Sequence, residues 1–118
     1  MMQLEIKEKT YQVKFGTKFV TEMDKRHTMK NEQGEFGMGL ETTAPFLLAR
    51  KITTLAEYLY VGTVTEKPRP SFDAVCDYLD EVEDIEAVFL EVETELEQSN
   101  ASKLFIGNLK REMEKVEA

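Results

Sequence analysis

The longest apolar stretch of the chain runs from Ala44 to Gly62, and it holds only three charged residues. One helical face carries large aliphatic side chains at regular spacing: Leu48, Ile52, Leu55 and Leu59. Other apolar side chains cover much of the remaining circumference, so this stretch must be buried in its own domain or against a partner chain. It is too short and too interrupted to cross a membrane.

Two helix-start signals divide this stretch. Thr43 precedes Ala44–Pro45, and proline suits a first helical turn, where its missing N–H would have no partner. Thr54 and Glu57 have the spacing of a capping box, in which each side chain satisfies a free backbone N–H. The sequence therefore predicts two short helices that meet at Thr53–Thr54.

Apolar and polar side chains alternate at the N-terminus, which predicts a β-hairpin over residues 1–16. Leu4 and Ile6 form the first apolar series, and Tyr11 and Val13 belong to the second, across a connection at Glu8–Lys9. Two strands alone are marginally stable, so we expect a helix or another subunit to cover them. A helix is predicted over residues 17–28, with its apolar side formed by Phe19, Val20 and Met23.

Residues 29–43 contain three glycines and show no sustained periodicity, which indicates a flexible loop. Phe36, Met38 and Leu40 would be costly to leave in water, and they are therefore candidates for docking onto another molecule. A nucleotide-binding loop is not indicated, because no Lys-Ser/Thr pair follows the glycines.

The part of the chain from residue 44 to 118 is predicted to be helical. Ser71 begins a helix after a proline-containing segment, and Asp84 begins another after a short break. A last helix is expected over residues 101–116. The fold class is therefore α+β and mainly α: a short N-terminal β-hairpin and about five to six helices in a single domain over residues 1–118.

Charge is distributed unevenly along the chain, whose net charge is −8. Residues 71–102 contain eleven Asp and Glu and no Lys or Arg, whereas residues 1–70 carry a net charge of +2. Unaided binding to nucleic acid is not expected, because phosphate contacts need clustered basic residues. The acidic block is either a solvated face or a docking surface for a basic partner or a neighbouring copy.

Catalytic chemistry is not indicated. The chain has one cysteine, one histidine and no tryptophan, so only carboxylates remain as reactive groups. The carboxylates spaced along the helix that follows Ser71 would suggest a metal or catalytic site only if they converged on a cleft. Cys76 excludes an internal disulfide and fits a reducing cytosol. We expect no enzyme activity, no cofactor and no metal.

The order of these segments resembles a known family. A hairpin and helix (LEIKEKTYQVKFGTKFVTEM) are followed by an apolar helix pair with a tyrosine-rich end (LLARKITTLAEYLYVGT). An acidic helical half opens with PSFDAVCDYLDEVED. This layout is similar to that of the tail assembly chaperones of long-tailed, non-contractile phages of Gram-positive bacteria.

The resemblance implies a small, helical, non-catalytic protein. It would bind the tape measure protein and keep it soluble in the host cytoplasm until the tail tube polymerises, and it would be absent from the mature virion. Self-association, and a longer form made by translational frameshifting, are further expectations of the resemblance.

The resemblance by itself implies no particular interface residues. A protein that holds a long apolar helix needs adaptable exposed apolar surface and a strong net charge. Our hypothesis assigns contacts with partners or neighbouring subunits to Phe36, Met38, Leu40, Tyr58, Tyr60, Phe89, Leu104 and Phe105. The alternative for each residue is an ordinary place in the core. The alternative function is an acidic interaction inhibitor or DNA mimic, whose Asp and Glu side chains would imitate phosphates.

Overall fold

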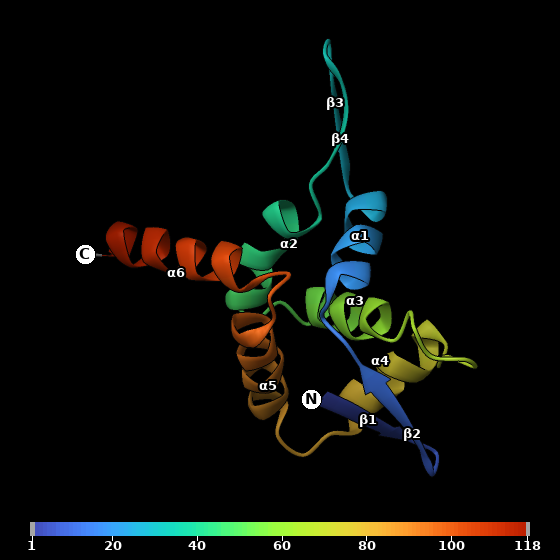
Figure 1. Cartoon of the computed structure of the whole chain (residues 1–118). Helices are drawn as coiled ribbons and strands as arrows, with labels where there is room; N and C mark the ends of the chain where they lie inside the picture. Colours follow the sequence, from blue (N-terminus) through green and yellow to red (C-terminus); the bar gives the residue numbers. More distant parts are fainter. Residues whose placement is uncertain (1, 118) are drawn as a thin grey trace.

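Two β-hairpins and six helices make up the structure, a computed structural model that describes residues 2–117 (Figure 1). The strands are β1 (Met2–Ile6), β2 (Lys9–Val13), β3 (Thr28–Asn31) and β4 (Gly34–Gly37). The helices are α1 (Thr17–Arg26), α2 (Gly39–Leu48), α3 (Ile52–Gly62), α4 (Phe72–Glu81), α5 (Ile85–Gln98) and α6 (Lys103–Glu117). The predicted class, α+β and mainly α, is confirmed.

The N-terminal hairpin pairs β1 with β2 in antiparallel register, with Ile6 opposite Lys9. Its turn is therefore Lys7–Glu8, one residue earlier than predicted, and both residues have positive φ values of 50° and 67°. That conformation matches the right-handed twist of a hairpin, but it is usually taken by Asn or Gly. The hairpin docks on α3 through a 2.8 Å hydrogen bond from Lys14 N–H to Gly62 O.

The hydrophobic core lies where α1, α2, α3 and α5 meet the N-terminal hairpin. Phe19 is its aromatic centre: its ring lies edge-on to Phe15 at 4.9 Å and to Tyr58 at 5.2 Å between centroids. The largest fully buried side chains are Tyr58, Phe19, Met2, Leu4, Met23, Leu47, Leu55, Leu59, Leu96, Ile106, Val13 and Val75. The apolar segment 44–62 is thus covered mainly by its own chain.

The prediction of a flexible loop over residues 29–43 is wrong. This segment forms most of a second antiparallel hairpin, β3–β4, and the first half of α2. The hairpin turn lies at Glu32–Gln33, where the Asn31 side chain accepts a 2.7 Å hydrogen bond from Gln33 N–H. Gly34 follows with a φ of +136°, which a side chain would strain. The glycines therefore belong to the hairpin turn and to the end of the hairpin next to α2, and they do not make the segment flexible.

The break between α2 and α3 lies at Arg50, before the predicted junction at Thr53–Thr54. Arg50 has a φ of 69°, and its N–H donates to Leu47 O while Lys51 N–H donates to Phe46 O. This is the helix-ending Schellman arrangement, with arginine in the place that glycine usually takes. The predicted start of a helix at Ala44–Pro45 is also wrong, because α2 begins at Gly39 and includes Pro45.

The predicted starts of the two helices in the acidic half are confirmed. Ser71 caps α4 by accepting a 3.0 Å hydrogen bond from Ala74 N–H, and Asp84 caps α5 by accepting one of 3.1 Å from Ala87 N–H. The capping box predicted at Thr54 and Glu57 is absent from α3, which starts at Ile52.

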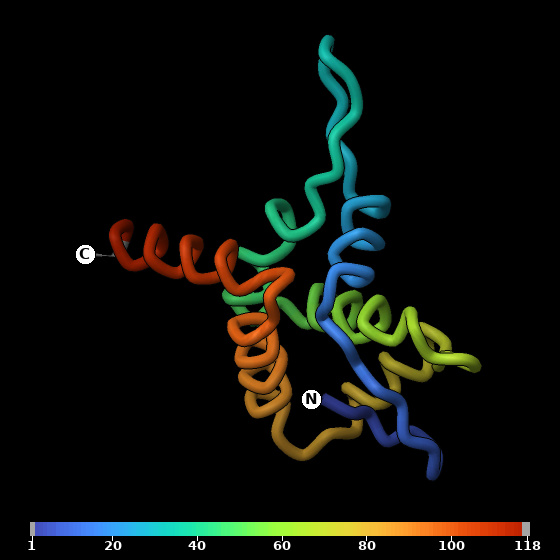
Figure 2. Tube along the Cα trace, in the orientation of Figure 1, coloured from blue at the N-terminus to red at the C-terminus, as the bar shows by residue number. Residues whose placement is uncertain are grey.

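The molecule is flat and branched. Its radius of gyration is 14.7 Å, with extents of 46 × 36 × 23 Å, whereas a compact domain of this length has a radius of about 13.5 Å. The accessible surface is 7593 Å², compared with about 6,600 Å² for a compact protein of this mass. Figure 2 shows the cause: the β3–β4 hairpin and α6 both project from the body.

Candidate interaction surfaces

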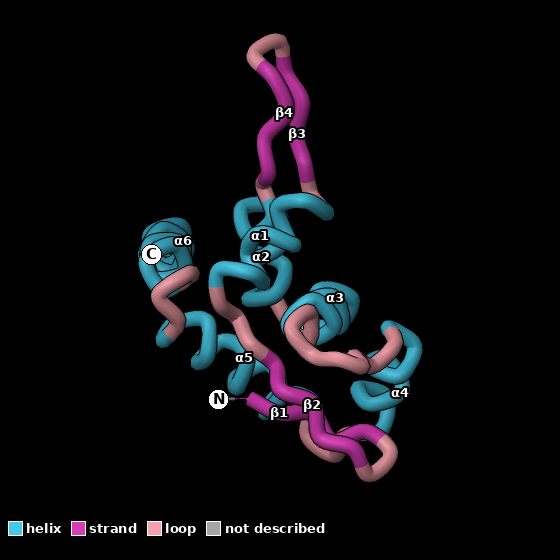
Figure 3. Tube along the Cα trace, turned by 45° about the vertical axis from the view of Figure 1, so that its right-hand side comes forward, coloured by secondary structure: helices cyan, strands magenta, loops and turns pink. Residues whose placement is uncertain are grey.

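The β3–β4 hairpin, which we call the arm, projects from the body of the fold (Figure 3). Every residue of both strands is exposed. Met29 and Phe36 lie directly opposite each other in the strand register and are 54% and 45% exposed. Cross-strand neighbours share one face of a hairpin, so these two side chains form a single apolar patch.

The base of the arm is closely fitted to α1. Met38 N–H donates to His27 O at 2.7 Å, and Gly39 N–H donates to Asp24 Oδ1 at 2.8 Å. A Cβ atom on Gly37 would lie 2.5 Å from Asp24 Cβ, and one on Gly39 would lie 2.6 Å from the Met23 carbonyl carbon. Both glycines therefore allow the chain to pass against α1, which fixes the direction of the arm.

His27, Arg26 and Glu57 form a cluster of polar contacts next to this base. His27 Nε2 lies 2.9 Å from the Glu57 carboxylate, which also accepts a 2.9 Å hydrogen bond from Arg26 Nε. Glu57 thus joins α3 to the end of α1. Such a pair has a structural role, because it crosslinks two helices.

Three predicted contact residues lie in the core instead: Leu40, Tyr58 and Phe89. Tyr58 is fully buried, and its hydroxyl lies 2.8 Å from Thr43 Oγ1, which also donates to Gly39 O at 2.7 Å. Burial raises the pKa of Tyr58 far above its ordinary value. These side chains cannot bind a partner in this fold, because tertiary packing places their helical faces inward.

The remaining predicted residues lie nearer the surface. Met38 and Phe105 are half-buried, as is Tyr60, which packs between the Phe72 ring and the guanidinium of Arg69. Leu104 is exposed at the start of α6. Of the eight predicted residues, Phe36 and Leu104 are thus the exposed ones, and they lie on the two projecting elements.

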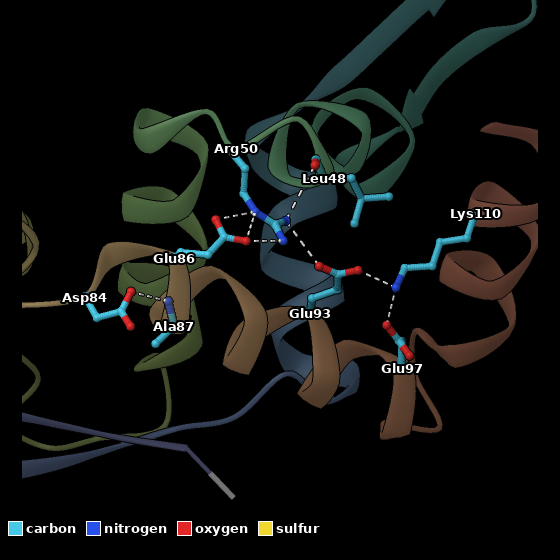
Figure 4. A network of polar contacts seen from close by, with 8 residues as sticks. All are labelled: Leu48, Arg50, Asp84, Glu86, Ala87, Glu93, Glu97 and Lys110. Carbon is cyan, nitrogen blue, oxygen red and sulfur yellow. Dashed lines mark hydrogen bonds and ion pairs between the residues drawn. The ribbon is translucent and has the colours of Figure 1, made fainter. Parts of the chain in front are cut away.

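A network of ion pairs joins α6 and the Arg50 turn to α5 (Figure 4). Arg50 binds Glu86 through Nε and Nη2 at 2.9–3.0 Å, and its Nη1 donates to Glu93 at 3.1 Å. Lys110 of α6 bridges Glu93 and Glu97. Partial burial by itself would raise the pKa of Glu93, but the hydrogen bonds and charges of Lys110 and Arg50 outweigh it and lower that pKa.

Several surface hollows are present, and the larger ones have mixed polar linings. One of about 370 Å³ lies between the N-terminal hairpin and α4, and one of about 520 Å³ lies between α1 and the segment after α3. Among residues 2–117, His, Cys, Asp and Glu form no group that could hold a metal ion. Within the same range, none of the helices combines the length and apolar character needed to cross a membrane.

Sequence reasoning missed several exposed apolar residues: Met29, Phe46, Ile52, Phe72 and Leu90. For Met29 a sequence signal existed: the four residues Asn31 to Gly34, which follow Met29 and Lys30, are polar or glycine and are typical of a hairpin turn. The other exposed side chains were assigned to helices correctly, but a helical pattern alone does not say which face a neighbour covers.

Comparison with protein-family models decides the family. The model described as "Phage tail assembly chaperone protein, TAC" matches residues 3–110. The chain belongs to this family. The match covers both hairpins, α1 to α5 and the first half of α6 of this tail assembly chaperone. Comparison with curated proteins gives no match, and comparison with solved structures gives none either.

Proposed function

We propose that this tail assembly chaperone binds the tape measure protein and keeps it soluble before the tail tube polymerises. The observation that carries this function is the apolar patch of Met29 and Phe36 on a projecting arm. A monomer that needed no partner would bury such a pair, because exposing large apolar side chains together is unfavourable. The arm base holds the patch away from the body, where a long client can reach it.

The charge of the molecule suits the same task. A net charge of −8 keeps a complex with an apolar client dispersed by mutual repulsion. In this proposal the protein has no catalytic role, acts in the host cytoplasm and is absent from the virion. Leu104 and Phe105 at the start of α6 contribute to self-association, and a longer frameshifted form would share the same arm.

A DNA-mimic role is less well supported. Three carboxylates of the acidic block, on Glu86, Glu93 and Glu97, are already paired with Arg50 or Lys110 within the chain. They are therefore not free to imitate phosphates. A mimic would also lose its partner steeply as salt rises, whereas apolar contacts persist or strengthen.

The test is co-expression with the tape measure protein, with the amount of soluble client as the measurement. The double variant Met29→Ser and Phe36→Ser should leave most of the client insoluble. Leu90→Ser is the matched control, since Leu90 is a similarly exposed apolar residue on α5. Equal soluble client with the arm variant and with the parent would contradict a role for the arm.

A further inference from the structure

An apolar groove runs between α3 and α4, apart from the arm. It has a volume of about 230 Å³ and is lined by Ile52, Thr53, Ala56, Phe72, Cys76, Leu79 and Asp80. Tyr60 near the end of α3 packs on Phe72 at the start of α4, with ring centroids 5.7 Å apart, and the chain turns back between the two helices (Figure 1). The lining spans Phe72 to Asp80 of α4, about two turns or roughly 12 Å, and Ile52 to Ala56 of α3, about one turn or roughly 6 Å.

The groove has small residues in its floor and large apolar residues at its ends. Ala56 and Leu79 are the buried members of the lining, and Cys76 is half-buried. Ile52 and Phe72 are 45% and 44% exposed at opposite ends. Grooves that receive an amphipathic helix have this form, because apolar side chains of the guest enter between the end residues.

Acidic side chains border the groove on the α4 side. Asp73 and Asp80 lie three residues before and four residues after Cys76, so they share its helical face. Burial raises the pKa of the Cys76 thiol, and the carboxylates of Asp73, Asp80 and Asp77 raise it further. Asp80 itself lines the groove, so negative charge lies at its edge. All three carboxylates are exposed.

The basic residues near the groove are already engaged. The Lys51 ammonium lies 5.0 Å from the centre of the Phe46 ring, and Arg69 stacks on Tyr60 and donates to its carbonyl. Among the described residues, neither one forms an ion pair with a carboxylate of α4, and α4 itself has no basic residue. A guest helix with acidic flanks would be repelled, whereas one with Lys or Arg beside its apolar stripe would pair with the rim.

We propose that the α3–α4 groove binds a segment of the client as an amphipathic helix whose apolar stripe is flanked by basic residues. The arm and the groove then provide two separate contacts on one chain. The identity of the client rests on the proposed holding function, but the chemistry of the groove is testable without it.

The lone cysteine provides the measurement, because an occupant of the groove would cover Cys76. The probes are three synthetic peptides of two to three helical turns: a leucine stripe with lysine flanks, the same stripe with glutamate flanks, and a scrambled lysine peptide. The lysine-flanked helix should slow maleimide labelling of Cys76 and bind about tenfold more tightly than the glutamate-flanked helix. Equal labelling rates with and without the lysine-flanked helix would overturn the proposal.

Surface variants locate the binding. Ile52→Ser should weaken binding of the lysine-flanked peptide about tenfold, because it removes an apolar contact at one end of the groove. Asp80→Asn should weaken the same peptide and should strengthen the glutamate-flanked one. Leu90→Ser is the matched control and should change neither. Equal loss with Leu90→Ser would place the binding elsewhere and contradict the groove.

The two proposals fail in different ways. If Ile52→Ser still protects the tape measure protein while peptide binding is lost, the holding function stands and the groove is not its site. If the peptide shields Cys76 but the parent chain never keeps the tape measure protein soluble, the groove stands and the holding function fails.

Discussion

The buried hydroxyl pair of Thr43 and Tyr58 shows how single atoms set the cost of a substitution. Thr43 Oγ1 donates to Gly39 O, so the Tyr58 hydroxyl donates its own proton to Thr43 Oγ1. Thr43 therefore keeps a partner when Tyr58 is changed, whereas Tyr58 loses its partner when Thr43 is changed. The penalty for an unsatisfied buried polar group makes these two substitutions unequal.

Tyr58→Phe should lower the free energy of unfolding by about 1 kcal/mol, the net value of one hydrogen bond. Thr43→Val should lower it more, by about 2–3 kcal/mol, because it leaves a buried hydroxyl without a partner. Urea unfolding of both variants measures the difference. Equal losses would mean that water or a shifted side chain satisfies Tyr58 in the Thr43 variant.

At the scale of the element, the direction of the arm is fixed by its attachment to α1. Gly39→Ala should cost about 1–3 kcal/mol of unfolding free energy, because the new methyl group would overlap the Met23 backbone. Gly107→Ala in α6 is the matched control: its nearest neighbour would be the flexible Arg111 guanidinium at 3.7 Å. That variant should gain up to about 1 kcal/mol from helix propensity. Thermal unfolding of the two proteins should therefore shift in opposite directions.

The ion pairs that join α6 to α5 depend on the charge of Glu93. Its pKa is lowered in the fold, so its contribution to stability is present above the ordinary value of 4.5 and is lost as pH falls through the lowered pKa. Glu93→Gln should cost about 1–2 kcal/mol at neutral pH. The difference from the parent should shrink in acid, as urea unfolding across this range measures. An exposed neighbour on α5 gives the control, Glu91→Gln, whose cost should be small at every pH.

Helical periodicity predicted about five to six helices where the structure has six among the described residues, since apolar spacing indicates a helix wherever one face is buried. It was insufficient at Arg50, because the chain ends α2 there with arginine in a left-handed conformation that sequence rules assign to glycine. The arm was missed because glycine at positions 34, 37 and 39 has two explanations, mobility or close packing. Likewise, both Phe36 and Tyr58 were predicted as contact residues, but Phe36 is exposed whereas Tyr58 is buried, since its orientation depends on α1 and α2.

At the scale of the whole molecule, excess surface and negative charge act against each other. The accessible surface exceeds that of a compact protein by about 1,000 Å², and apolar groups on it favour association. The net charge of −8 opposes association between copies. We therefore expect the balance to depend on the ionic strength of the solution.

Raising salt from about 0.05 M to about 0.5 M should increase the mass measured by light scattering, because screening removes the repulsion and leaves apolar contacts intact. The variant with Met29→Ser and Phe36→Ser should respond less. A fall in mass with salt would instead indicate that ion pairs join the copies, as between the acidic block of one and a basic segment of another.

The arm pairs its strands only with each other among the described residues, so the outer edge of each strand has backbone groups open to solvent. Open edges can pair with strands of other chains and start aggregation, and a chaperone that formed fibres could not keep a client soluble. Lys30, Glu32 and Glu35 place charges along and beside these edges. Replacing them with neutral residues would remove this safeguard and favour amyloid-like assembly of the arm.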